Sequence, residues 1–201
     1  MYIELTEHLR CPEEHEEQTY LVLVPQAMEG RAVTAGSVGC PVCKKEYAID
    51  DGVAHFGGPT AASAGVPGGV ATSLPAVDTV QALLGITGPG GYVVLVGSAA
   101  RLAGDLAEVM EGVHFVGVNA PGDVTPSGAI SLLSHPSVIP LKPSMARGVI
   151  VGADHAVEPW LSEASRLVLR GLRLVVLAED AAAPGTKQLA SGDGMWVGVR
   201  E

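Results

Sequence analysis

The stretch Gly90-Gly-Tyr-Val-Val-Leu-Val-Gly-Ser-Ala-Ala-Arg-Leu-Ala-Gly-Asp-Leu-Ala-Glu-Val-Met-Glu-Gly-Val-His-Phe-Val-Gly-Val-Asn119 decides the fold. Residues 92–96 are an unbroken apolar, β-branched run, which is typical of a strand buried on both faces. A turn of small residues begins at Gly97, and apolar residues then recur at helical spacing over 102–110. A second apolar strand at 113–118 completes a βαβ unit. Ligands of such sheets bind at the carboxyl ends of the strands, so a nucleotide-like cofactor, if one binds, is expected at Gly97.

The residues around this unit continue the alternation of helices and strands, which predicts a doubly wound α/β layer structure. A hairpin turn at Gly192-Asp-Gly194 predicts a closing pair of strands at the carboxyl end. The expected helices are 76–86, 127–134 and 157–169, and the further expected strands are 137–140, 147–152, 172–179, 186–191 and 195–200.

Composition limits the classes of function. The chain has 201 residues, of which 47% are hydrophobic and 17% charged, so it can bury a sizeable core. Its net charge is −10 and it has no basic patch, which argues against direct binding of nucleic acid. It has no apolar run of the roughly 20 residues that a membrane span needs, and no basic-then-apolar leader. A cytoplasmic protein is expected.

The chain divides by composition into three parts. Residues 57–75 are rich in glycine, proline, serine, threonine and alanine and carry no charge, which is typical of a flexible linker. A phosphate-binding glycine loop would need a strand before it and a helix after it, and neither flank fits. We therefore expect a small first domain at 1–56 and an α/β domain at 76–201.

All three cysteines lie in the first domain, which suggests a metal site. Cys40-Pro-Val-Cys43 is a C-x2-C knuckle, and Cys11-Pro-Glu-Glu-His15 begins with the same Cys-Pro pair. Hairpin strands at 19–24 and 31–38 would bring the two knuckles together. A tetrahedral zinc ion with a Cys3His ligand set is therefore predicted. His8 is the alternative fourth ligand, and three free thiols with an unrelated histidine are the other alternative.

This pattern resembles the Trm112 family of small zinc-ribbon proteins. The resemblance rests on the paired Cys-Pro knuckles and on the segment from Cys40 through Tyr47-Ala-Ile49 and Asp51-Gly-Val53 to Phe56. Alanine replaces both prolines of the family pattern, and C-x3-H replaces its first C-x2-C. The resemblance implies a ribbon that stabilises a methyltransferase catalytic subunit by pairing a strand with its sheet.

The second domain resembles class I S-adenosylmethionine-dependent methyltransferases. The residues that carry this resemblance are Ala146-Arg-Gly-Val-Ile-Val-Gly-Ala-Asp-His155 and Trp160-Leu-Ser-Glu-Ala-Ser-Arg-Leu-Val-Leu-Arg-Gly-Leu-Arg-Leu-Val-Val-Leu177. They match the fourth strand, a helix and the fifth strand of that fold. Together with the hairpin turn, the resemblance implies a Rossmann-like, mainly parallel sheet with helices on both faces and an antiparallel last strand at 195–200.

The cofactor motifs of that family are eroded here. Gly97 is the first glycine of the expected Gly-x-Gly-x-Gly turn, but Ser98 and the following side chains stand where the backbone should approach a ligand. Leu95 replaces the acid that precedes the turn. Asn119 replaces the acid that grips the ribose, and it can still hydrogen-bond a hydroxyl without the strength of a carboxylate. Binding of S-adenosylmethionine is therefore doubtful, and Gly97, Ser98 and Asn119 are its candidate residues.

No catalytic residue is assigned. Asp154-His155 could act as a general base, but such a pair more often caps a loop. Arg101 could bind an anion, but a solvated arginine at a helix start is the plainer interpretation. Trp160 is expected in the core or in an interface.

Two functional hypotheses follow from these patterns. The first is a non-catalytic zinc-binding scaffold or regulatory partner subunit whose methyltransferase-like domain has lost its cofactor turn. The alternative is a working methyltransferase with a divergent site. The expected partner of the ribbon, through residues such as Val53 and Phe56, is its own second domain, a second copy in a homodimer, or a separate methyltransferase-type subunit.

Overall fold

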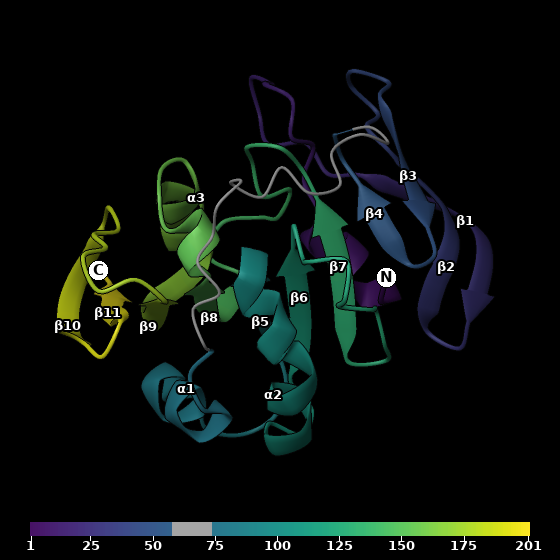
Figure 1. The fold of residues 1–201 in the computed structure, drawn as a ribbon. Helices are drawn as coiled ribbons and strands as arrows, with labels where there is room; N and C mark the ends of the chain where they lie inside the picture. Colours follow the sequence, from purple (N-terminus) through teal and green to yellow (C-terminus); the bar gives the residue numbers. More distant parts are fainter. Residues whose placement is uncertain (58–73) are drawn as a thin grey trace.

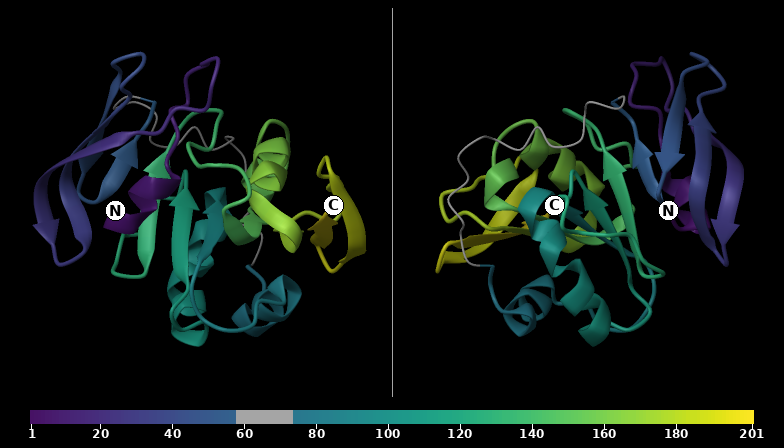
Figure 2. Two further views of the ribbon diagram at one scale, coloured as in Figure 1. Left: turned by 180° about the vertical axis from the view of Figure 1, so that it is seen from behind. Right: turned by 45° about the vertical axis from the view of Figure 1, so that its right-hand side comes forward.

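The computed structural model describes residues 1–57 and 74–201, and the strands in these residues form one 11-stranded sheet (Figure 1). Its order is β1-β2-β3-β4-β7-β6-β5-β8-β9-β11-β10. Most of the linker predicted at 57–75 lies outside the described residues, so that boundary stays a prediction. The N-terminus lies toward the β1–β4 end of the molecule and the C-terminus at the β10–β11 end (Figure 2).

Five parallel strands make the centre of the sheet. They are β5 (Tyr92–Val96), β6 (His114–Val118), β7 (Ile130–Ser134), β8 (Ala146–Val151) and β9 (Val168–Val176). Numbered within this group, their spatial order is 3-2-1-4-5, which is the order of a Rossmann-like sheet. The order reverses between β5 and β8, so the carboxyl ends of these two strands form the switch point.

Helices cover both faces of this sheet, as the sequence predicted. Val93 and Leu95 of β5 share a core with α1 (Val77–Leu84), the 3-10 helix η2 (Gly97–Leu102) and α2 (Ala103–Val109). Val94 and Val96 point to the other face and share a core with α3 (Trp160–Leu167) and η1 (Ile3–His8). The alternation explains why β5 is apolar throughout, because each of its faces meets a separate hydrophobic cluster.

The carboxyl-terminal hairpin also has the predicted form. Strand β10 (Thr186–Gly192) pairs antiparallel with β11 (Met195–Arg200), which in turn pairs antiparallel with β9. The turn contains Asp193 and Gly194, both with positive φ. The prediction of one antiparallel strand at 195–200 beside a mainly parallel sheet is confirmed.

Two predicted elements are wrong. Residues 127–134, predicted as a helix, contain strand β7, all five residues of which are buried. Residues 137–140, predicted as a strand, are irregular. A short apolar run fits a buried strand and a buried helix equally well, and pairing with β6 and β4 decides between them here. The helix predicted at 157–169 is shortened to α3 because residues 168–169 already belong to β9.

The first domain is a small antiparallel sheet that joins the central one. Strands β1 (Val22–Glu29), β2 (Ala32–Gly39), β3 (Glu46–Asp50) and β4 (Val53–His55) pair in sequence order. The hairpin predicted at 19–24 and 31–38 therefore forms, with its first strand three residues later than expected. No helix in the described ranges combines the length and apolar character that a membrane span requires.

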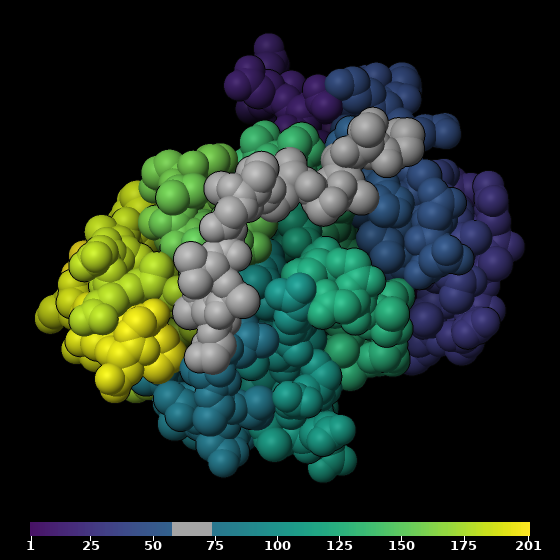
Figure 3. All heavy atoms as spheres, viewed as in Figure 1, coloured from purple at the N-terminus to yellow at the C-terminus, as the bar shows by residue number. Residues whose placement is uncertain are grey.

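Strand β4 continues the sheet into the second domain of the same chain. It pairs parallel with β7, with Val53 opposite Leu132 and His55 opposite Ser134, and the Phe56 N–H donates to the Ser134 carbonyl at 2.8 Å. One hydrophobic core runs across this seam. In Figure 3 the blue residues of the first domain lie directly against the green residues around β7. The docking contact expected for Val53 and Phe56 thus forms within one chain.

Candidate metal centre and cofactor turn

The structure brings the four predicted metal ligands together. Cys11 and His15 lie in the loop between η1 and β1, and Cys40 and Cys43 lie in the turn between β2 and β3. Their ligand atoms all lie within 4.8 Å of one another. The Cys11 and Cys43 sulfurs are 3.8 Å apart, and the Cys40 sulfur is 3.4 Å from His15 Nε2.

These separations fit a tetrahedral metal ion. Zinc–sulfur bonds of about 2.3 Å and zinc–nitrogen bonds of about 2.0 Å imply S···S edges of about 3.8 Å and S···N edges of about 3.5 Å. The cluster could therefore hold one metal ion. The alternative ligand His8 lies on η1 with its ring against Tyr92, at 4.8 Å between centroids.

The thiols of the cluster differ in acidity. Burial opposes ionisation of Cys40, but backbone N–H groups of Cys43 and Val42 outweigh it and lower its pKa to about 7. Burial raises the pKa of Cys11 to about 11, although the Tyr47 hydroxyl and the Glu13 backbone act in the opposite direction. A divalent cation would favour the thiolate at both positions, because the ligand form of cysteine is deprotonated.

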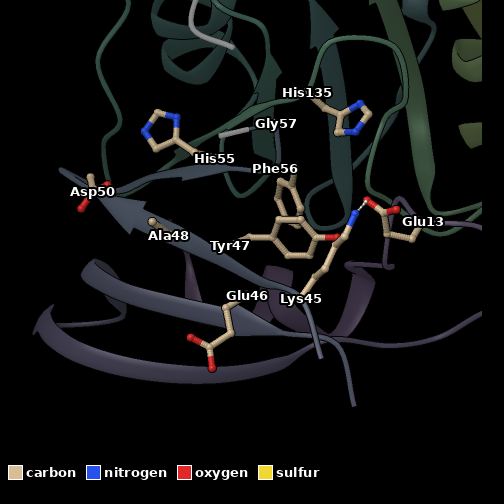
Figure 4. Close-up of a pocket in the computed structure, with 10 residues that line it drawn as sticks. All are labelled: Glu13, Lys45, Glu46, Tyr47, Ala48, Asp50, His55, Phe56, Gly57 and His135. Atoms are coloured by element: carbon tan, nitrogen blue, oxygen red, sulfur yellow. Dashed lines mark ion pairs between the residues drawn. The ribbon is translucent and has the colours of Figure 1, made fainter. Parts of the chain in front are cut away.

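Sequence reasoning missed the neighbour of this cluster, Tyr47. Its hydroxyl lies 3.5 Å from the Cys11 sulfur, and its side chain is buried in β3. The alternation of buried Tyr47 and Ile49 with exposed neighbours along β3 is the signal that points the ring inward. Figure 4 shows Tyr47 beside Phe56. Both residues line a cavity of about 710 Å³, together with Lys45 and Glu13, whose side chains form an ion pair at 2.8 Å.

The candidate cofactor turn lies at the switch point, and an internal carboxylate fills it. The Ser98 backbone N–H lies 3.0 Å from both carboxylate oxygens of Asp154, and the Ser98 hydroxyl donates to the same group at 2.6 Å. A Cβ on Gly97, which has φ of 64°, would lie 2.2 Å from His155 Nδ1 and 2.7 Å from the Asp154 carboxylate. The glycine is therefore needed for packing against Asp154 and His155.

Hydrogen bonding keeps the Asp154 side chain ionised. Burial disfavours its charge, but the adjacent His155 ring and the hydrogen bonds from Ser98 prevail and lower the pKa of Asp154 to about 2. His155 is buried, with Nδ1 3.1 Å from the carboxylate and its ring edge-on to Trp160 at 4.9 Å. Sequence reasoning named these residues but missed their contact with Ser98. The adjacency of β5 and β8, whose carboxyl ends meet, is the signal that could have found it.

The side chains of the two remaining candidate residues, Asn119 and Arg101, also contact other residues of the chain. The Asn119 amide donates to the His135 carbonyl at 2.9 Å, and its oxygen accepts the His135 N–H at 3.0 Å. Asn119 therefore ties the end of β6 to the end of β7. Arg101 forms a partly exposed ion pair with Asp123 at 2.7 Å. It is therefore a surface arginine, which agrees with the interpretation as a solvated arginine at a helix start.

Comparison of the sequence with protein-family models and with curated proteins found no match. Among solved structures, the chain is similar to a candidate methyltransferase of an antibiotic biosynthesis pathway from Anabaena variabilis (18% identity, TM-score 0.42, 52% of this chain and 44% of that one). It is also similar to the antibiotic-resistance methyltransferase Kmr (14% identity, TM-score 0.43, 65% of this chain and 95% of that one). A third similar structure is the complex of the Haloferax volcanii Trm112 methyltransferase activator with a candidate methyltransferase (18% identity, TM-score 0.39, 49% of this chain and 50% of that one).

The chain thus spans about half the length of the first and third of these structures. At such low identities and TM-scores the fold class rests on the strand order itself. That order, with its single inserted antiparallel strand β11, defines a methyltransferase-like Rossmann fold extended by a small sheet that carries a Cys/His cluster.

Proposed function

We propose that the protein is a non-catalytic, zinc-binding scaffold or regulatory partner subunit. In this proposal a Trm112-like ribbon is joined to a methyltransferase-like domain that has lost its cofactor turn. The observation that supports this proposal most directly is the hydrogen bond that the Asp154 carboxylate accepts from the Ser98 N–H at the switch point of the sheet.

The chemistry of S-adenosylmethionine explains why this contact matters. Its methionine end carries a carboxylate, which would compete with the internal carboxylate for the backbone N–H groups of the turn. The second feature that a cofactor needs, a free hydrogen-bonding side chain at the end of β6, is also lacking, because Asn119 is bonded to His135 on both sides of its amide.

The ribbon supplies the second half of the proposal. Zinc held by Cys11, His15, Cys40 and Cys43 would join the loop after η1 to the β2–β3 turn and stabilise that end of the sheet. Such a site suits the cytoplasm, where thiols stay reduced.

The partner of the scaffold is proposed to bind away from β4. That strand pairs with β7 of its own chain, so a separate methyltransferase-type subunit would need another surface. A homodimer formed by exchange of the same contact between two chains is the alternative arrangement.

Calorimetric titration of the zinc-loaded full-length protein with S-adenosylmethionine and S-adenosylhomocysteine tests the central claim. No heat of binding at ligand concentrations up to millimolar is expected. The alternative, a methyltransferase with a divergent turn, draws support from Gly97, which retains a positive φ at the switch point. Micromolar binding of either ligand would establish that alternative and overturn the scaffold proposal. Metal analysis separately tests for one zinc per chain.

A further inference from the structure

Tyr47 reaches the candidate metal cluster from the strand that follows the second knuckle. Its hydroxyl lies 3.5 Å from the Cys11 sulfur, and both side chains are buried. A thiolate can only accept a hydrogen bond, so when Cys11 is deprotonated the phenol is the donor.

A metal site of this composition benefits from such donors. Three thiolates and a neutral imidazole around a divalent cation leave a net charge of −1 in partly buried surroundings. The donors that offset this charge at Cys40 are backbone N–H groups of Cys43 and Val42. At Cys11 they are the Glu13 backbone and the Tyr47 hydroxyl.

The Tyr47 ring is itself held in place. It packs against Phe56 with ring centroids 4.9 Å apart and planes tilted by 39°. Phe56 is anchored in turn, because its N–H donates to the Ser134 carbonyl at the end of β7. The close-up in Figure 4 shows the two rings side by side between β3 and β4. The hydroxyl is therefore aimed at Cys11 by packing that extends to the second domain.

We infer that Tyr47 is a positioning residue of the metal centre, which orients the Cys11 thiolate and limits its electron donation to the ion through a phenol–thiolate hydrogen bond. The inference rests on the proposed metal site. Groups that hydrogen-bond to metal ligands without touching the metal typically change affinity by about 10- to 100-fold.

The test uses full-length Tyr47→Phe protein, which keeps the ring and its contact with Phe56 and removes only the hydroxyl. The control is Tyr20→Phe, whose side chain is largely exposed. Cobalt(II) is the probe, because its thiolate-to-metal charge-transfer band reports directly on the sulfur lone pairs. Zinc affinity is measured in parallel by competition with a chromophoric chelator.

Loss of the hydrogen bond should make the thiolate a stronger donor. We expect the stronger donation in Tyr47→Phe to move the charge-transfer band to lower energy. The thiolate also loses its orientation and the compensation of its charge, so zinc binding should weaken about 10-fold, while Tyr20→Phe matches the wild type. The band position is read per bound cobalt, so a lower folded fraction changes its height only. An unchanged band with unchanged zinc affinity would overturn the role of Tyr47 and leave the metal site standing. Wild-type protein without any thiolate band would instead overturn the metal site itself.

Discussion

Asp154 is the residue whose side chain fills the turn at the switch point of the sheet. Its carboxylate accepts hydrogen bonds from the Ser98 backbone and the Ser98 hydroxyl and lies 3.1 Å from His155 Nδ1. Asp154→Asn keeps the size of the side chain but removes its charge, so we expect the free energy of unfolding to fall by about 1–2 kcal/mol. Urea denaturation at pH 7, followed by tryptophan fluorescence, measures this difference.

Asp123→Asn is the matched control for this change. Asp123 pairs with Arg101, but this pair is largely exposed, so its loss should change the stability little. Equal effects of the two substitutions would show that the carboxylate at the switch point has no special structural role.

His114 predicts a pH dependence of stability. Its ring stacks on Tyr2 at 4.6 Å and bonds the Ser131 hydroxyl at 2.9 Å. Burial, and then the nearby Met1 ammonium, lower the pKa of His114 to about 4. Between pH 6.5 and pH 4 the unfolded chain binds a proton here that the folded chain does not, so stability is lost as the pH falls through this window.

The size of this loss is bounded by the shift, at about 3 kcal/mol, since the pKa of His114 falls by about 2.5 units and one unit is worth about 1.4 kcal/mol. In His114→Gln the loss of stability between pH 7 and pH 4.5 should be smaller than in the wild type, as measured by urea denaturation at each pH. His55→Gln serves as the control. A wild-type pH dependence that survives unchanged in His114→Gln would argue that the ring is protonated equally in both states.

Among the elements, strand β4 carries the seam between the two domains. Phe56 directly follows it, is 3% exposed, and packs between Tyr47 and the end of β7. Phe56→Ala should therefore lower the free energy of unfolding by about 3–4 kcal/mol. Val22→Ala on the exposed side of β1 should have little effect, because Val22 is 57% exposed. Similar losses in thermal melts of the two variants would contradict the assignment of Phe56 to the core.

The elements also show how far sequence reasoning reaches. The unit from β5 through α2 to β6 was predicted because each of its signals is local: an apolar run, small residues, then helical spacing. Strand β7 was missed because Ile130-Ser-Leu-Leu-Ser134 becomes a strand only through its neighbours β6 and β4. Convergence of Cys11, His15, Cys40 and Cys43 was predictable from knuckle spacing. The contact of Ser98 with Asp154 was not predicted, because no local pattern indicates it and only the order of strands in a Rossmann-like sheet brings the two residues together.

At the scale of the whole molecule, the shared core couples the metal cluster to the methyltransferase-like domain. Both tryptophans, Trp160 and Trp196, are buried in the second domain and so report on its unfolding. If zinc stabilises the first domain, a chelator in excess should lower the melting temperature seen by tryptophan fluorescence. The same treatment of a Cys40→Ser variant should cause no further drop. Tryptophan melting that is indifferent to zinc would indicate that the domains unfold independently.

The parallel pairing of β4 with β7 has a genetic consequence. The residues of its ladder and the described residues of the core beneath it come from two ranges, 1–57 and 74–201, so these contacts could also form between two separate polypeptides. Two separate reading frames encoding these pieces should yield polypeptides that find each other in the cell, and an affinity tag on one should retain the other.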